Sequence, residues 1–138
     1  MKTDKTTRRA PSTSKRLTGD VGRAVRAALD KKAVDVVVLD LRETPAFTDF
    51  FVLCSGTSQR QVKAIADGIE EALRAAQVRP AHVEGYDRAE WILMDFFTFI
   101  VHVFTPQTRE FYSLERLWGD AKRTEVPAPA PAGEAGGT

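Results

Sequence analysis

Residues 84–120 read EGYDRAEWILMDFFTFIVHVFTPQTREFYSLERLWGD and carry the strongest structural signals in the chain. Two apolar strands are predicted here, over Trp91–Phe96 and Thr98–Phe104, and their short separation makes them a hairpin. The second strand is apolar on both alternating faces, which is typical of a strand in the middle of a sheet. Thr105-Pro106 has the character of a helix start, and a helix is predicted over Arg109–Trp118 with Gly119 as its C-terminal cap.

The preceding residues predict two further helices and three further strands. A first helix, capped by Asp20, has apolar residues at helical spacing up to Leu29. A second begins near Ser58, where Ser58 and Gln61 have the spacing of a capping box. The further strands are β-branched or apolar runs over Val34–Leu41, Phe50–Cys54 and Ala81–Glu84. The order α-β-β-α-β-β-β-α predicts an α/β fold with a mixed five-stranded sheet flanked by helices.

The chain of 138 residues has the length of one domain, and 43% hydrophobic residues suffice for a core. Residues 1–16 are basic and polar, and residues 125–138 are rich in Pro, Ala and Gly. We therefore expect one folded domain over 17–124, between a disordered basic arm and a disordered tail. Residues 19–133 hold 17 acidic and 14 basic side chains. A slightly acidic domain with a basic arm fits a protein partner on one side and RNA on the other, although composition alone describes the arm as a solvated tail.

A single cysteine, Cys54, allows no internal disulfide and favours a reducing compartment. No apolar run approaches the ~18 residues that a membrane span needs. The basic N-terminus lacks the apolar block of a secretory signal. We expect a cytoplasmic protein without membrane association.

The side chains that commonly carry catalysis are few and scattered. Cys54 ends an apolar strand without a His beside it in the sequence, so a buried, unreactive thiol is the favoured interpretation. His102 lies inside an apolar strand and is interpreted as a hydrogen-bonded core or sheet-face residue. One Cys and two scattered His lack the spacing of a metal site, and no Asp-x-Asp pair is present to hold a divalent ion. We therefore predict no catalytic residues, no cofactor and no metal.

The loop Ser55-Gly56-Thr57-Ser58 precedes a helix and could bind an anion, since helix N-termini attract phosphate. No Lys follows as it does in a P-loop. Helix capping by Ser58 accounts for the same residues and is the favoured interpretation, with an anion site as the alternative.

Aromatic and charged residues gather around the start of the strand Trp91–Phe96. Trp, Tyr and Arg are enriched where protein interfaces bind most strongly, but a Trp at the start of a strand equally fills a core, and the pattern favours neither interpretation. The acidic members repel phosphate, which argues against RNA as the partner of this cluster. The cluster comprises Tyr86, Asp87, Arg88, Glu90, Trp91 and Asp95.

Four segments together carry a resemblance to a known family. They are VVVLDLR (Val36–Arg42), TDFFVLCSGTSQRQVKAIAD (Thr48–Asp67), HVEGYDRAEWILMDF (His82–Phe96) and IVHVFTPQTREFYSLERLWGDA (Ile100–Ala121). On these motifs the chain resembles the Iojap-related family, the family of ribosomal silencing factors (RsfS). The resemblance spans nearly the whole predicted domain and neither tail.

The resemblance implies a nucleotidyltransferase-like fold without the catalytic carboxylates of that class. It also implies binding to the large ribosomal subunit through its ribosomal protein number fourteen, on the face that meets the small subunit. Occupying that face would block subunit joining and repress translation when nutrients are short. Organelle relatives are tied to large-subunit assembly, so an assembly factor is the alternative, with a nucleotidyltransferase-type enzyme using the Ser55–Ser58 loop as a further one.

By match to the family, the contact with the ribosomal protein falls on Trp91 and the strand after it. The expected anchors are Trp91 and either Leu93 or Met94, whichever faces outward, while Asp95 and Glu90 pair with basic residues of the partner. The predicted partner-binding residues are Tyr86, Asp87, Glu90, Trp91, Leu93, Met94 and Asp95.

Family members usually have Gly-Asp between the last two strands, where this chain has Phe97-Thr98. Without the freedom of glycine at positive φ, the turn is expected to adopt another geometry. Phe96 and Phe97 are expected either to enlarge the apolar contact patch or to form the edge of a homodimer.

Overall fold

Six strands pair into one sheet in the computed structural model, which describes residues 19–129. The strands are β1 (Val34–Asp40), β2 (Phe50–Ser55), β3 (His82–Glu84), β4 (Trp91–Asp95), β5 (Phe99–Phe104) and β6 (Lys122–Val126), in the spatial order β3-β4-β5-β2-β1-β6. Only β2 and β5 run parallel, so the sheet is mixed, as predicted. The predicted disorder of the arm (1–16), and of most of the tail, lies outside the described residues.

The predicted number of five strands is wrong because β6 was missed. Its sequence, KRTEV, has too weak an apolar pattern to predict a strand. It is an edge strand that pairs antiparallel with β1, from Val36 opposite Val126 to Asp40 opposite Lys122, and only Val126 is buried. Exposed charges are typical of an edge strand, where they discourage pairing with other chains. The folded region therefore continues through Val126, two residues beyond the predicted boundary at 124.

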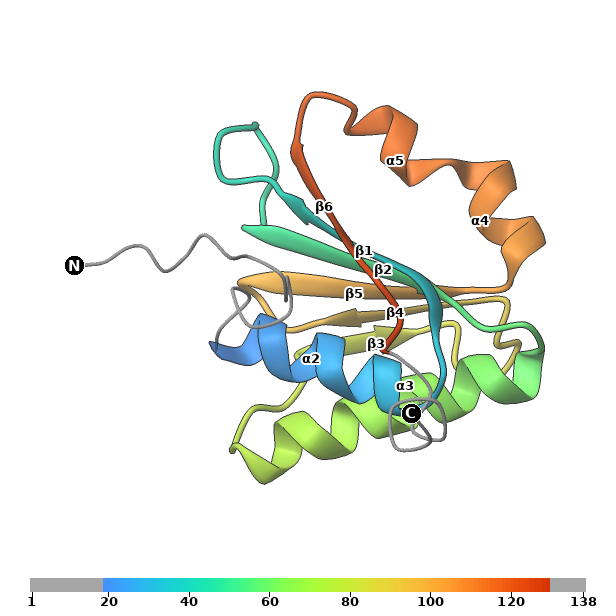
Figure 1. The fold of residues 1–138 in the computed structure, drawn as a ribbon. Helices are drawn as coiled ribbons and strands as arrows, with labels where there is room; N and C mark the ends of the chain where they lie inside the picture. The colour runs from blue at the N-terminus through green and yellow to red at the C-terminus, as the bar shows by residue number, and fades with distance from the viewer. Residues whose placement is uncertain (1–18, 130–138) are drawn as a thin grey trace, which may run out of the picture.

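Helices lie on both faces of the sheet in the part of the chain that the structure describes (Figure 1). On one face lie α2 (Gly19–Asp30) and α3 (Gln59–Ala75), and on the other α4 (Pro106–Tyr112) and α5 (Leu114–Leu117). The predicted start at Pro106 is confirmed. Asp20 lies within the first turn of α2 rather than before it, and its carboxylate accepts a hydrogen bond from Arg23.

The last predicted helix, Arg109–Trp118, is two helices separated by Ser113. Ser113 has a φ of 48°, in the left-handed region, and its N–H donates to the carbonyl of Arg109. This residue ends α4 and redirects the chain, so that Leu114 and Trp118 of the following turn pack against the sheet. The second helix ends at Leu117, with Trp118 rather than Gly119 as its cap.

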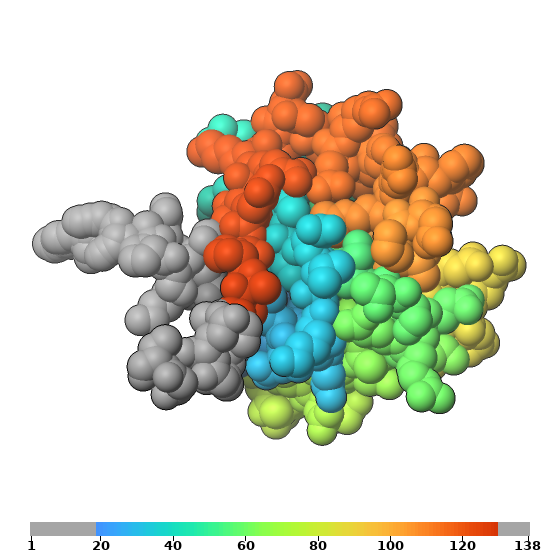
Figure 2. All heavy atoms as spheres, turned by 45° about the vertical axis from the view of Figure 1, so that its right-hand side comes forward, coloured from blue at the N-terminus to red at the C-terminus, as the bar shows by residue number. Residues whose placement is uncertain are grey.

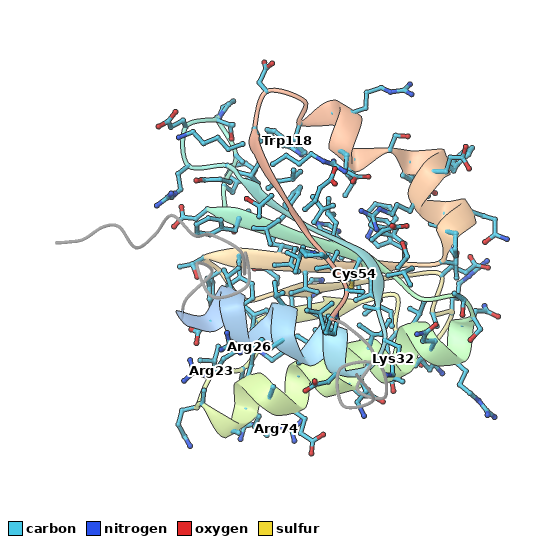
Figure 3. All side chains as sticks on the ribbon, in the orientation of Figure 1. Arg23, Arg26, Lys32, Cys54, Arg74 and Trp118 are labelled. Atoms are coloured by element: carbon cyan, nitrogen blue, oxygen red, sulfur yellow. The ribbon has the colours of Figure 1, made fainter. Side chains whose placement is uncertain are left out.

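Buried side chains form a core on each face of the sheet. The larger core lies between the sheet and α2 and α3, where Cys54 is placed, and Trp118 reaches the sheet from the opposite side (Figure 3). Alanines on α2, such as Ala24 and Ala28, have no exposed surface and allow close approach of the helix. The smaller core comprises Val37, Leu39, Leu41, Phe51, Leu53 and Phe104, beneath α4 and α5.

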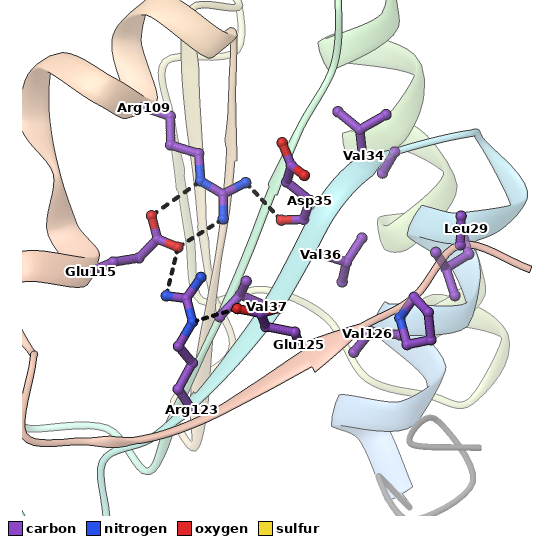
Figure 4. Close-up of a pocket in the computed structure, with 13 residues that line it drawn as sticks. Leu29, Val34, Asp35, Val36, Val37, Arg109, Glu115, Arg123, Glu125 and Val126 are labelled. Carbon is purple, nitrogen blue, oxygen red and sulfur yellow. Dashed lines mark hydrogen bonds and ion pairs between the residues drawn. The ribbon is translucent and has the colours of Figure 1, made fainter. Parts of the chain in front are cut away.

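A chain of ion pairs ties α4 and α5 to the far edge of the sheet (Figure 4). Arg109 donates to both carboxylate oxygens of Glu115, at 3.3 and 3.0 Å, and to the carbonyl oxygen of Asp35 at 2.7 Å. Arg123 of β6 donates to the same Glu115 carboxylate at 3.0 Å. Burial alone would raise the pKa of Glu115, but the two arginines outweigh it and hold that pKa below its usual value. The pairs line a hollow of about 880 Å³ between β1, β6 and the helices.

We expect Glu115→Ala to lower the free energy of unfolding by about 2 kcal/mol, because the Arg109 side chain is only 11% exposed and would lose its anion. Denaturant unfolding at pH 7 measures the loss. The matched control is Glu125→Ala, which also removes a partner of Arg123 but is 74% exposed, and should cost less than about 0.5 kcal/mol. Equal losses in the two variants would contradict this account of how α4 and α5 are held.

Candidate functional site

Alternation along β4 decides which of the predicted contact residues can reach a partner. Successive strand residues point to opposite faces. Ile92 and Met94 point into the core beneath α3 and are 0% and 1% exposed, whereas Trp91, Leu93 and Asp95 point to the other face and keep part of their surface. Of the two alternatives Leu93 and Met94, Leu93 is therefore the outward member and Met94 is buried, while contact of Leu93 with a partner stays a prediction.

The face to which Leu93 points is only partly covered by α4 and α5, which leave β3 and much of β4 uncovered (Figure 1). Leu93 lies opposite Glu84, and Asp95 lies between His82 and Ile100 in the register of the sheet. His82 and Glu84 form an exposed pair at 2.6 Å. We call this surface the open face, and it comprises His82, Glu84, Trp91, Leu93, Asp95, Ile100 and Tyr112.

Trp91 stands at the border between the open face and the core. Its ring centroid is 5.2 Å from that of Phe104 and 4.8 Å from that of Tyr112 on α4. Its Nε1–H donates to Nδ1 of His102 at 3.0 Å. The core interpretation is confirmed, since the indole packs on the core in a fixed orientation; it also presents part of its surface to solvent, and contact with a partner there stays a prediction.

His102 is a hydrogen-bonded core residue, as predicted, and is 3% exposed. Burial lowers its pKa to about 3, so the imidazole is neutral at physiological pH. Since Nδ1 accepts from Trp91, the ring proton resides on Nε2. That atom is buried and has no hydrogen-bond partner among residues 19–129, while the Phe51 ring stands edge-on with centroids 4.6 Å apart.

The predicted cluster around Trp91 is divided between two faces. Tyr86 turns toward α3, where its hydroxyl donates to Asp67 at 2.9 Å and Lys63 lies 5.1 Å from its ring centroid. The hydrogen bond to Asp67 raises the pKa of Tyr86. Asp87 and Arg88 line the same hollow beside α3 as Tyr86, and Arg88 is paired with Glu90 at 3.4 Å. Contacts through Tyr86, Asp87 and Glu90 stay a prediction.

The loop into β4 depends on Gly85. Its φ is +81°, and a Cβ built on it would lie 2.1 Å from the carbonyl oxygen of Trp91. Only glycine avoids both the strain and the overlap. The backbone position of Trp91 therefore rests directly on this residue.

The turn between β4 and β5 buries one of its two phenylalanines and exposes the other. Phe96 is 5% exposed and stacks on Phe99, with ring centroids 4.9 Å apart, so it is unavailable as a dimer edge. Phe97 is 73% exposed and keeps a positive φ of 74°, although it is not glycine. The residue that replaces glycine was expected to avoid positive φ, but it does not, because the Phe97 N–H donates to Asp95 Oδ1 and Thr48 Oγ1 donates to the Phe97 carbonyl, and these two bonds hold the conformation.

Residues considered for catalysis are engaged in the fold. Burial raises the pKa of Cys54 to about 12, which keeps the thiol protonated, as an unreactive core cysteine would be. In the following loop, the Gly56 N–H donates to the Phe104 carbonyl and the Thr57 N–H donates to Gln61 Oε1. Ser58 Oγ accepts from the Gln61 N–H at 3.1 Å, so the predicted helix cap is confirmed.

Two further observations concern only residues 19–129. No three His, Cys, Asp or Glu side chains there gather in a way that could hold a metal ion. None of the helices there is both long enough and apolar enough to traverse a bilayer.

Tyr112, Ile100 and His102 contribute to the site but were not among the predicted contact residues. Tyr112 is 49% exposed and covers one side of the Trp91 indole. Its motif, REFY, was visible in the sequence, but only the helix start at Pro106 places Tyr112 against β4. Ile100 lies opposite Asp95, at the outer end of the open face.

Comparison with known proteins places these features in a class. A solved protein from Chromobacterium violaceum shares the fold, with a TM-score of 0.71 at 34% identity, over 81% of this chain and 94% of that one. The two chains therefore share the same α/β fold. The sequence profile described as "Ribosomal silencing factor during starvation" (RsfS) matches residues 14–136. The chain belongs to the RsfS family.

Named relatives agree with this assignment. A protein from Halalkalibacterium halodurans named "Ribosomal silencing factor RsfS" is 41% identical over 103 residues, which cover 75% of this chain and 88% of the relative. A mouse protein named "Mitochondrial assembly of ribosomal large subunit protein 1" is 31% identical over 72% of this chain and 45% of its own length. The nucleotidyltransferase-like character of the fold stays a prediction.

The buried imidazole predicts how stability depends on pH. The unfolded chain takes up a proton on His102 near pH 6.5 and the folded chain only near pH 3, so the unfolded state binds more protons between these values and stability falls as the pH is lowered. Relative to His102→Asn, whose Oδ1 can still accept from Trp91, the wild type should lose about 2 kcal/mol between pH 7 and pH 5. Unfolding in denaturant at both pH values measures this. Parallel pH profiles would show that the histidine is not buried as described.

Gly85→Ala should destabilise the protein by at least about 2 kcal/mol, because the added Cβ meets the Trp91 carbonyl at 2.1 Å in a left-handed backbone conformation. Thermal unfolding measures the loss. Gly19 offers a control, since it also has a positive φ, of +68°, but no atom lies within 4 Å of its Cβ position. Gly19→Ala should cost about 1 kcal/mol or less. A Gly85 variant as stable as the Gly19 variant would contradict the predicted overlap.

Proposed function

We propose that this protein is a ribosomal silencing factor that binds the large ribosomal subunit through ribosomal protein number fourteen. It occupies the face that meets the small subunit, so that joining is blocked and translation is repressed under nutrient limitation. Membership of the RsfS family supports the ribosomal role. The proposal assigns the protein no bond-making chemistry, and its place of action is the cytoplasm.

The observation that carries this proposal is the open face. It combines a fixed, partly exposed Trp91 with partly exposed Leu93 and Ile100, beside an uncovered strand edge at β3. Large aromatic side chains held in one orientation contribute most to protein interfaces, because little conformational freedom is lost on binding. An interface of about 800 Å² per partner suffices for stable docking. Apolar surface of this kind suits a protein rather than RNA.

The charges on and around the open face are predominantly acidic. Asp95 and Glu84 lie on it and Glu90 at its edge, while Arg88 is paired with Glu90. Acidic groups at the rim of an interface speed the encounter with a basic partner and select against phosphate. We propose ribosomal protein number fourteen as the partner that the open face contacts. Contact between the N-terminal arm and ribosomal RNA belongs to the same proposal as a weak, salt-dependent addition.

A role in large-subunit assembly is the second candidate, and the name of the mouse relative favours it. The same docking surface serves both roles, because each needs stable attachment to the large subunit. They differ in when the protein acts. A silencing factor lowers joining of mature subunits in a purified mixture, whereas a pure assembly factor leaves that joining unchanged and alters the profile of precursor particles in cells.

Trp91→Ala should weaken binding to purified bacterial large subunits by at least about 2 kcal/mol, or roughly thirtyfold in Kd, since the variant removes the fixed aromatic anchor. Cosedimentation through a density gradient at low protein concentration measures the loss. The wild type should also reduce the joining of purified large and small subunits, and the variant should not.

Two further variants separate lost contact from lost folding. Leu93→Ala changes a partly exposed residue and should weaken binding while the thermal unfolding curve stays close to wild type. Val34→Ala changes a 39% exposed residue three strands away in the sheet, and should bind like the wild type. Full cosedimentation of Trp91→Ala with large subunits would refute the assigned surface.

A further inference from the structure

Phe97 holds a backbone conformation that its side chain does not favour. Its φ is 74°, where a bulky residue is an outlier and glycine is not. Three hydrogen bonds hold the turn: the Phe97 N–H donates to Asp95 Oδ1 at 2.8 Å, the Thr98 N–H to the Phe96 carbonyl at 2.9 Å, and Thr48 Oγ1 to the Phe97 carbonyl at 2.9 Å. The bond from residue 98 to residue 96 has the span of a γ-turn, which is a strained conformation when φ is positive.

The side chain of Phe97 buries little apolar surface and therefore contributes little to stability that could offset this strain. It is 73% exposed, while its neighbour Phe96 is 5% exposed and stacks on Phe99. Glycine would take the same backbone conformation without strain. Strained residues of this kind occur mainly where another molecule uses them.

A second phenylalanine is presented next to this turn. Phe47, in the loop between β1 and β2, is fully exposed. Its loop is tied to the turn by the Thr48 bond to Phe97 and by the Asp49 N–H, which donates to the Thr98 carbonyl at 2.9 Å. We call Phe47 and Phe97, on these two joined loops, the phenylalanine tip.

In the part of the chain that the structure describes, the unpaired charge around the phenylalanine tip is negative. Arg42 is engaged by Asp40, with hydrogen bonds of 2.9 and 2.7 Å, and lies over the Phe50 ring. The other nearby charges are the acidic residues Glu43, Asp49 and Asp95, and within residues 19–129 only Glu43 has a base, Lys122, as near as 4.0 Å. Phosphate and anionic lipid are repelled by such a rim. A second copy of this chain would bring the same acids together across a twofold axis.

We propose that the phenylalanine tip is a second anchor for the large subunit, with Phe47 and Phe97 entering an apolar recess that has a basic rim on a ribosomal protein. This rests on the proposed function, and extends its surface from Trp91 along β4 to the turn at its other end. Asp95 joins the two parts, since it belongs to the open face and accepts the hydrogen bond from the Phe97 N–H.

The test compares Phe97→Gly and Phe47→Ala in the full chain, with Leu117→Ala as a control for an exposed apolar residue on α5. Phe97→Gly should raise the melting temperature by a few degrees as strain is released, yet weaken binding to purified bacterial large subunits at least about fivefold. Phe47→Ala should weaken binding similarly with an unchanged melting temperature. Leu117→Ala should change neither quantity.

The outcomes separate this inference from the proposed function. If both tip variants bind large subunits normally while Trp91→Ala binds poorly, the phenylalanine tip is not an anchor. The proposed function is unaffected by that result. A lowered melting temperature for Phe97→Gly overturns the inference too, because the side chain would then serve the fold. Two further results would contradict the inference if subunit binding by the tip variants is unchanged. Loss of a dimer in light scattering would assign the tip to a second copy of this chain, and loss of flotation with anionic vesicles would assign it to a lipid surface. A wild-type protein that ignores large subunits refutes both proposals.

Discussion

Unequal cover of the two sheet faces is the constraint on which the rest of this structure depends. The long helices α2 and α3 bury one face, while the short pair α4 and α5 lies over only part of the other (Figure 2 shows α3 and the α4–α5 segment on opposite sides of the strands). Because a strand sends alternate residues to opposite faces, β4 must commit Ile92 and Met94 to the buried side and Leu93 to the open one. An apolar, partly acidic surface follows from this cover. The surface to which we assign docking therefore arises from the sheet itself.

Trp91 joins the buried and the open parts of this arrangement. Its hydrogen bond to His102 and its contacts with Phe104 and Tyr112 fix the ring before any partner arrives. A side chain that is already ordered loses less entropy on binding, and more of its contact energy becomes affinity. The fold carries a matching cost, since His102 is buried with one nitrogen unpartnered and must stay neutral.

The sequence predicts best the elements that are buried on both faces. The apolar runs of β1, β2 and β5 leave a clear mark, and Ser58 identifies the start of α3. Strand β6 cannot be predicted from the sequence pattern, because an edge strand is held by backbone pairing and keeps charged side chains. The helix break at Ser113 cannot be predicted either, because no local sequence signal indicates a left-handed φ at a serine. The packing of Trp118 on the sheet favours the break.

The site itself was predictable in composition but not in geometry. Leu93 and Met94 are both apolar, so only the position of α3 decides which of them is buried. Likewise Tyr86 is close to Trp91 in sequence, yet a glycine turn and the bond to Asp67 send it to the other face. The missed contributors, Tyr112 and Ile100, come from elements that meet β4 only in the folded chain.

Local conflicts mark the two ends of β4. Trp91 at the start of β4 bonds to His102, whose buried Nε2 has no partner among residues 19–129, and beyond the other end Phe97 holds a strained turn. Sequences are expected to violate local rules mainly where function demands it. A strand of five residues spans roughly 17 Å, so the two anchors that we propose at its ends would fix the orientation of the bound protein as well as its attachment. Orientation matters for the proposed steric action, because a single anchor permits rotation away from the surface that the protein has to cover.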